Sequence, residues 1–187
     1  MAKKAAKRQE RHRTLGAGRI AALLLSLLLT AAILVFNPGA QLKAQLGDWG
    51  YVGIFLIMLL NNATVILPAP GLLAVFAAGS SYNFLLVGIA GGLGAALGEL
   101  TGYLFGYGSL AFVKEEKSGI YRRVERWMQG NGFITILVLA ALPNPFFDVA
   151  GITAGALKYP WWRFLVACAI GAVIKATVLA YLGRSLL

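Results

Sequence analysis

The sequence is poor in the residues on which most enzymes and disulfide-rich scaffolds depend. Its 187 residues contain one cysteine, Cys168, and one histidine, His12, which lies in a basic tail. A single cysteine excludes an intrachain disulfide and a cysteine-based zinc site. An HExxH zinc motif, a glycine-rich phosphate loop and a nucleophile-elbow serine are also lacking. We therefore expect no enzymatic activity, no bound metal and no cofactor.

Charged residues are also scarce, at 13% of the chain, against roughly 25% in soluble domains. The chain is 59% hydrophobic, and its mean hydropathy of +0.74 indicates an integral membrane protein. The chain has seven acidic and seventeen basic residues, which gives a net charge of +10. Because bases gather in residues 1–19, directly before an apolar run, we assign them to the cytoplasmic membrane surface rather than to nucleic acid.

Five stretches with few or no charges approach or exceed the roughly 20 residues that a spanning helix needs. They cover residues 20–36, 49–80, 82–113, 133–157 and 164–183. Two of them are interrupted by paired prolines, Pro68 with Pro70 and Pro143 with Pro145. Two prolines within three residues stop a helix. Each interrupted stretch is therefore predicted to be two half-helices joined by a polar turn.

The distribution of basic residues favours one topology. If all five stretches crossed the membrane, nine bases would face the cytoplasm and seven the outside. If the two interrupted stretches are re-entrant hairpins from opposite sides, fourteen bases face the cytoplasm, Lys43 and Arg184 lie outside, and Lys175 lies in the membrane. Bases concentrate on the cytoplasmic side, so we expect the hairpins. An inverted repeat of hairpin and long helix follows.

We thus predict an all-α, multi-pass protein of the cell (cytoplasmic) membrane with a cytoplasmic N-terminus. Its expected parts are a basic cytoplasmic tail (1–14), an N-terminal transmembrane helix (15–36) and a membrane domain (49–187) made of a hairpin (49–80), a helix (82–113), a basic amphipathic linker (114–130), a second hairpin (131–157) and a last helix (160–184). Two alternatives stay open: residues 20–36 as a cleaved signal peptide, and the linker as a plain solvated segment.

Glycines recur at four-residue spacing in the segment 82–113. Gly94, Gly98, Gly102 and Gly106 share one face of the predicted helix, where they let another backbone approach closely. Packing alone explains such a row, and a hairpin arm lying in the groove would agree with it.

Three ionisable residues fall within the predicted interior: Glu99, Asp148 and Lys175. A charge in lipid is costly, so an intramembrane acid or base indicates function unless it is paired. Pairing of Lys175 with either acid would make a structural lock. A water-filled cavity would instead make the three residues a substrate or proton site, and both interpretations stay open.

Asparagines accompany the predicted hairpin tips: Asn61 and Asn62 precede the first proline pair, and Asn144 precedes Pro145, as a good N-cap would. Half-helix N-termini near the midplane direct N–H groups and positive dipole ends at an anion. An anionic lipid headgroup suits this geometry. The predicted substrate-binding residues are Asn61, Asn62, Pro68, Pro70, Glu99, Tyr103, Pro143, Asn144, Pro145, Asp148 and Lys175.

From about Trp49 to Leu187 the chain resembles the DedA/VTT domain family, also called the SNARE-associated Golgi protein family. The motifs that carry the resemblance are Asn61-Asn62, Leu67-Pro68-Ala69-Pro70-Gly71, Gly94 to Glu99 with Gly102-Tyr103 and Gly106, Leu142-Pro143, Ala150-Gly151 and Gly155. The resemblance implies two re-entrant hairpins in inverted repeat and lipid movement between leaflets. Eukaryotic members resemble phospholipid scramblases, and bacterial members are associated with recycling the undecaprenyl phosphate carrier. Glu99 falls where many members carry an acid.

The chain departs from the pattern of bacterial members, which tend to carry two acids around the first tip and arginines beside the second proline turn. The corresponding residues here are Asn61 or Asn62, Leu72, Ala140 and Phe146. These departures favour passive scrambling over proton-coupled export.

We therefore expect a membrane lipid transporter, scramblase- or flippase-like, that moves a phospholipid or polyprenyl-phosphate headgroup between leaflets. Its expected partners are membrane lipids, anionic ones in particular, without nucleic acid; a homo-oligomer is compatible with the sequence. Two alternatives stay open: a proton- or ion-coupled transporter of a small solute, and a non-transporting membrane organiser.

Overall fold

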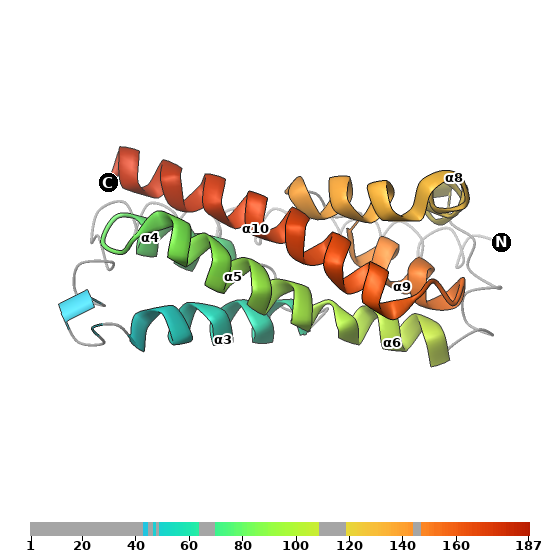
Figure 1. Cartoon of the computed structure of the whole chain (residues 1–187), viewed down its shortest axis with the longest axis horizontal. Helices are drawn as coiled ribbons and strands as arrows, with labels where there is room; N and C mark the ends of the chain where they lie inside the picture. The colour runs from blue at the N-terminus through green and yellow to red at the C-terminus, as the bar shows by residue number, and fades with distance from the viewer. Residues whose placement is uncertain (1–42, 45–46, 48, 64–69, 109–118, 144–146) are drawn as a thin grey trace, which may run out of the picture. The chain divides into compact units, whose positions relative to one another are not determined.

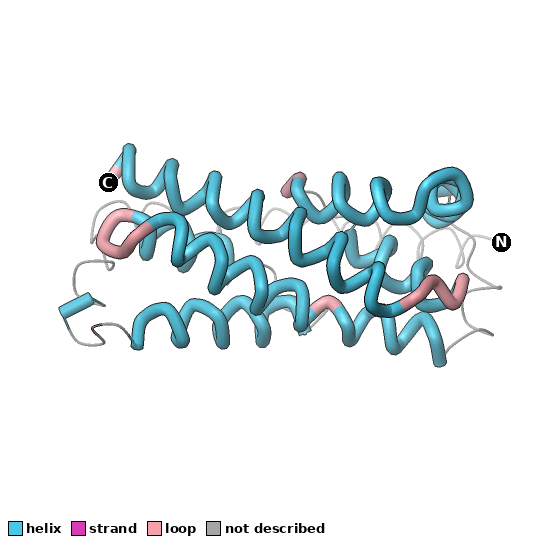
Figure 2. The backbone as a smooth tube through the Cα atoms, in the orientation of Figure 1, coloured by secondary structure: helices cyan, strands magenta, loops and turns pink. Residues whose placement is uncertain are grey.

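Helices build the described part of the chain, in which no strand occurs. The computed structural model describes residues 43–44, 47, 49–63, 70–108, 119–143 and 147–187. Its helices are α3 (Trp49–Ala63), α4 (Pro70–Gly79), α5 (Phe84–Gly98), α6 (Leu100–Gly108), α8 (Gly119–Ala141), α9 (Phe147–Ala156) and α10 (Trp161–Leu186), shown in Figure 1 and Figure 2. The prediction of an all-α protein is confirmed for these residues. The predicted tail (1–14) and first helix (15–36) lie outside them.

Two helical segments are long and apolar enough to cross a bilayer. One runs from Phe84 to Gly108 and combines α5 with α6, and α10 is the other. Glu99, between α5 and α6, keeps right-handed helical dihedrals (φ −65°, ψ −17°), so the chain continues in the same direction. Asn83 caps the start of α5, where its side-chain oxygen accepts a hydrogen bond from the N–H of Leu85 (3.0 Å).

Shorter helices occupy the two proline-interrupted stretches. In the first stretch α3 ends at Ala63 and α4 begins at Pro70; in the second α8 ends at Ala141 and α9 begins at Phe147. Proline suits the first position of a helix, because the N–H that it lacks would have no intrahelical partner there.

A sharp bend divides α8 at Asn131, whose backbone is extended (φ −150°, ψ 91°). The side-chain oxygen of Asn131 accepts a hydrogen bond from the N–H of Ile134 (3.2 Å), and its carbonyl accepts one from the Thr135 hydroxyl (2.8 Å). Asn131 therefore caps the second half of α8. The first half lies in the predicted linker and the second half in the predicted second hairpin.

The first half of α8 is attached to the rest of the domain by apolar side chains. Val124 and Met128 are buried in a core cluster that also contains Ile136 and Phe164. The same half of α8 also carries three exposed arginines, Arg122, Arg123 and Arg126. The segment is amphipathic, as expected, but two of its apolar side chains pack on protein rather than on lipid.

Small residues fill the interior of the domain, and large apolar residues cover its outside. The buried positions of α5 are five glycines, two alanines and Val87. Its exposed leucines and isoleucine, between 40% and 51% accessible, are Leu85, Leu86, Ile89, Leu93 and Leu97. A water-soluble fold buries such side chains. Small residues between helices and leucines outside are the pattern of helices packed in a bilayer.

Glycines bring the backbones of different helices into contact. On α4 and α10, Gly79 faces Ala180 and Gly183 faces Phe76; on α6 and α9, Gly106 faces Ile152 and Gly155 faces Tyr103. In each case another backbone occupies the place that a side chain would take. As a result α4 lies along α10 and α9 lies along α6 (Figure 1). All of these helices belong to one compact unit, Pro38–Leu187.

Substituting Gly106 by alanine should destabilise the domain, because the new Cβ would overlap the backbone of Ile152 on α9. We expect a loss of about 1–3 kcal/mol, the usual effect of overpacking. Thermal unfolding of the purified protein in detergent would show it as a lower melting temperature.

The matched control is Gly102→Ala in the same helix, because nothing lies within 4 Å of its Cβ position. Alanine is the better helix former, so the melting temperature of this control should stay level or rise. Equal losses in the two variants would contradict the packing described here.

Candidate functional site

Glu99, Asp148 and Lys175 come together from three parts of the chain. Glu99 joins α5 to α6, Asp148 lies in the first turn of α9, and Lys175 lies in α10. Each of them interacts electrostatically with the other two. Gly151, one turn after Asp148, lies against the backbone of Glu99. We call these three residues the charged cluster.

The three residues of the charged cluster are buried to different extents. Glu99 is 7% exposed, Lys175 is partly buried and Asp148 is exposed. The Nζ atom of Lys175 lies 6.0 Å from the centroid of the Phe147 ring. No N···O contact within 4.0 Å joins these three described side chains. A direct ion pair, the tightest form of a structural lock, is therefore not formed among these three residues.

The end of α3 packs beside Glu99. A side chain at Gly98 would overlap Asn62 and the backbone of Ala63. The Thr101 hydroxyl donates hydrogen bonds to the carbonyls of Ala63 (3.1 Å) and Gly98 (2.9 Å). Since Gly98 and Thr101 flank Glu99, the point where α3 ends lies next to the buried acid.

The end of α8 packs against α10 in the same manner. Gly171 lies against the carbonyl of Leu137 and the side chain of Ala140. Gly171 precedes Lys175 by one helical turn. Both interrupted stretches therefore reach the two long helices near a member of the charged cluster.

Asn61 and Asn62, at the end of α3, make hydrogen bonds to backbone groups. The Nδ2 of Asn62 donates to the carbonyl of Met58 (2.7 Å), and the Oδ1 of Asn61 accepts from the N–H of Gly71 (3.4 Å). Because Gly71 is the second residue of α4, Asn61 connects the end of one helix to the start of the next. Capping is a role that sequence reasoning assigned to Asn144 but not to Asn61.

Tyr103 is buried, and its hydroxyl donates a hydrogen bond to the carbonyl of Tyr159 (2.6 Å). Its ring packs on Phe164, with 5.2 Å between the centroids. These contacts hold α6 against the beginning of α10. Tyr103 was predicted as a substrate contact, and in this structure its hydroxyl connects α6 to the loop that precedes α10.

The proline turns contribute less to the described site. Pro70 begins α4, and Pro143 is exposed just after α8. Pro68, Asn144 and Pro145 lie outside the described residues, so their predicted roles remain expectations.

Two further residues adjoin the charged cluster and were missed by sequence reasoning. Cys168 is fully buried in α10 and interacts electrostatically with Glu99 and Lys175. Helical spacing could have indicated Cys168, because it precedes Lys175 by two turns and so shares its face. The position of Phe147 depends on how α9 packs, for which no local pattern exists.

The helices, their apolar exterior and the partly buried charged cluster define an α-helical membrane protein with a polar site between long and short helices. The VTT domain family matches residues 68–185, which is more than half of the chain. The chain belongs to this family, as its motifs predicted.

Similar proteins include several vacuole membrane proteins. The chain is 39% identical over 114 residues to Vacuole membrane protein KMS1 of Arabidopsis thaliana, an alignment covering 50% of this chain and 27% of that protein. It is 44% identical over 71 residues to the Vacuole membrane protein 1 homolog of Dictyostelium discoideum (35% and 18% covered). It is 49% identical over 53 residues to Vacuole membrane protein 1 of Homo sapiens (28% and 13% covered). The chain thus spans about a quarter of the Arabidopsis relative's length. No solved structure matches it.

Replacing Tyr103 by phenylalanine should lower stability, because the partly buried carbonyl of Tyr159 would lose its hydroxyl donor. We expect a cost of about 1 kcal/mol, measured as a lower melting temperature in detergent. Tyr107→Phe is the control, since Tyr107 lies one turn later and is exposed. A Tyr103→Phe variant as stable as this control would refute a structural role for the hydroxyl.

Proposed function

We propose that this protein is a membrane lipid transporter that lets an anionic headgroup, of a phospholipid or polyprenyl phosphate, pass between leaflets. The headgroup would move past the charged cluster while the tails stay in lipid. One observation carries the proposal: three ionisable side chains interact electrostatically, with no ion pair among them, where both interrupted stretches reach the long helices.

Helix length supports re-entrant hairpins. The helices α4 and α9 have 10 residues each, which gives about 15 Å at 1.5 Å per residue. The hydrocarbon core is about 30 Å thick. Helices of this length reach only its middle, so a chain that enters through α3 and leaves through α4 would return to the same side.

Reciprocal packing supports the inverted repeat. The short helix after the first interruption, α4, packs on α10, and the one after the second, α9, packs on α6. The contacting glycines match: Gly79 and Gly155 are 76 positions apart, and Gly106 and Gly183 are 77 positions apart. In each contact the short helix of one half packs on the long helix of the other half. Such contacts are expected when two halves are related by a two-fold axis in the membrane plane.

The charged cluster has the chemistry that headgroup passage requires. A phosphate in hydrocarbon needs a polar partner, and Lys175 offers an ammonium that makes no ion pair with Glu99 or Asp148. The two acids attract the lysine at longer range and would also repel the phosphate. A phosphate on Lys175 would therefore be held weakly.

Burial of Glu99 favours a second candidate, a proton- or ion-coupled transporter of a small solute. An acid that is 7% exposed within a membrane domain is a common proton carrier. This activity would appear as solute uptake that depends on the membrane potential and is lost in Glu99→Gln.

The leading proposal is tested with liposomes that contain the full chain and a headgroup-labelled fluorescent phospholipid. Dithionite bleaches only the outer leaflet, so scrambling takes bleaching from half toward completion. We expect Lys175→Met to slow this phase about tenfold, which corresponds to losing one charge-assisted contact of about 1.4 kcal/mol. The matched control is Arg184→Gln, because Arg184 is an exposed cation of the same helix, 5.5 Å from the Phe84 ring.

Two outcomes would count against the proposal. Bleaching that stops at half would exclude phospholipid scrambling; a labelled polyprenyl phosphate that also stays in its leaflet in the same vesicles would exclude lipid transport and leave the solute transporter or the membrane organiser. A Glu99→Gln/Lys175→Met double variant that recovers the full rate would make these residues a structural pair rather than a headgroup site.

A further inference from the structure

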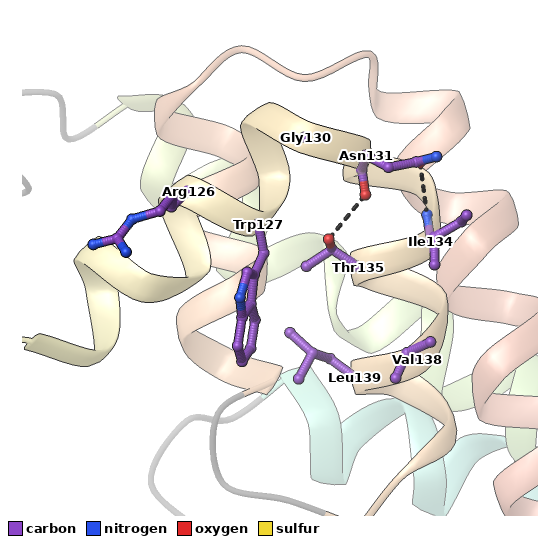
Figure 3. A pocket seen from close by; sticks show the side chains of 8 residues that line it. All are labelled: Arg126, Trp127, Gly130, Asn131, Ile134, Thr135, Val138 and Leu139. Atoms are coloured by element: carbon purple, nitrogen blue, oxygen red, sulfur yellow. Dashed lines mark hydrogen bonds between the residues drawn. The ribbon is translucent and has the colours of Figure 1, made fainter.

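A pocket of about 470 Å³ lies at the bend of α8, outside the charged cluster. Residues on both sides of Asn131 line it, among them Arg126 and Trp127 before the bend and Thr135, Val138 and Leu139 after it (Figure 3). We call it the elbow pocket. None of its lining residues belongs to the charged cluster.

The pocket exists because Asn131 is extended. Its non-helical backbone changes the direction of α8, so residues from the two halves border a common space. Figure 3 shows the Trp127 indole and the Leu139 side chain bordering the space between the halves. The Arg126 guanidinium extends away from these apolar groups.

The walls of the elbow pocket are apolar and open outward. Trp127 is 48% exposed, Ile134 is 56% exposed and Val138 is 45% exposed. In a membrane protein, a space bordered by exposed apolar side chains is open to lipid. A lipid tail is the chemical match for these walls.

The edge of the pocket is positively charged. Arg126 lines it, and two more exposed arginines, Arg122 and Arg123, lie on the same half of α8, against one acid, Glu125. A guanidinium binds phosphate through paired hydrogen bonds, and tryptophan favours the membrane–water interface. A basic edge next to apolar walls is complementary to one anionic phospholipid, which has a negative headgroup and apolar tails.

We propose that the elbow pocket binds one anionic phospholipid, with its phosphate on Arg126 and a tail along Trp127 and Val138. This proposal rests on the protein lying in a membrane and not on its moving lipid. The bound lipid would stabilise the bend at Asn131, and thereby the half of α8 that packs on α10 near Lys175.

The test uses the full chain with a single tryptophan, obtained by Trp49→Phe, Trp161→Phe and Trp162→Phe, so that only Trp127 fluoresces. The protein is placed in vesicles containing phosphatidylglycerol or phosphatidylcholine with brominated tails, which quench a nearby indole. We expect phosphatidylglycerol to reach half-maximal quenching at about a fivefold lower mole fraction than phosphatidylcholine does. This preference corresponds to about 1 kcal/mol for one basic residue.

Arg126→Gln should abolish this preference while leaving quenching by phosphatidylcholine. Arg163→Gln is the matched control, since Arg163 is also exposed but lies at the start of α10, outside the pocket. This control should keep the preference, and unchanged melting temperatures would show that both variants are folded.

Three results would overturn the proposal: equal quenching by the two lipids, a preference that persists in Arg126→Gln, or an indole that neither lipid quenches. The last result would mean that protein, such as a second copy of this chain, covers the pocket. None of these measurements depends on lipid transit, so failure of the proposed function and failure of this site are distinguishable.

Discussion

Close contact between helix backbones, made where glycines meet, is the constraint on which the rest of this domain depends. Burying leucine gives helices no gain inside lipid, so they associate by close packing and polar contacts. Gly88 against Thr177 and Gly92 against Val173 hold the long helices α5 and α10 together. The same kind of close contact surrounds Glu99, where Gly98 meets the end of α3, and such packing lets an acid be buried within a membrane domain.

Local chemistry explains what could be predicted from the sequence. Paired prolines stop a helix wherever they lie, so the ends of α3 and α8 were expected near them. Glycine spacing along one helix face likewise predicted a groove. Other helices pack against some of these glycines but not against all of them. Gly94 and Gly98 receive α3, Gly106 receives α9, and Gly102 meets neither helix.

Contacts between distant residues explain what could not be predicted. The hydroxyl of Tyr103 is bonded to a carbonyl 56 positions away, a pairing that no periodicity encodes. Glu99, Asp148 and Lys175 were recognisable as costly in lipid, but their meeting depends on how α9 packs on α6 and how α10 packs on α5. The elbow pocket was missed for another reason: Asn131 and Gly132 indicate a bend, yet the size of the space depends on the angle between the two halves of α8.

The composition of the charged cluster, one base with two acids, agrees with the proposed passage of a headgroup. A site built from several cations would bind a phosphate tightly, whereas transport requires binding that favours entry and still permits release. Here one ammonium is opposed by two carboxylates, one buried and one exposed. An anion on Lys175 would be attracted by this one group only, so the site would hold it weakly. Weak holding is the property that the proposed movement of a headgroup between leaflets requires.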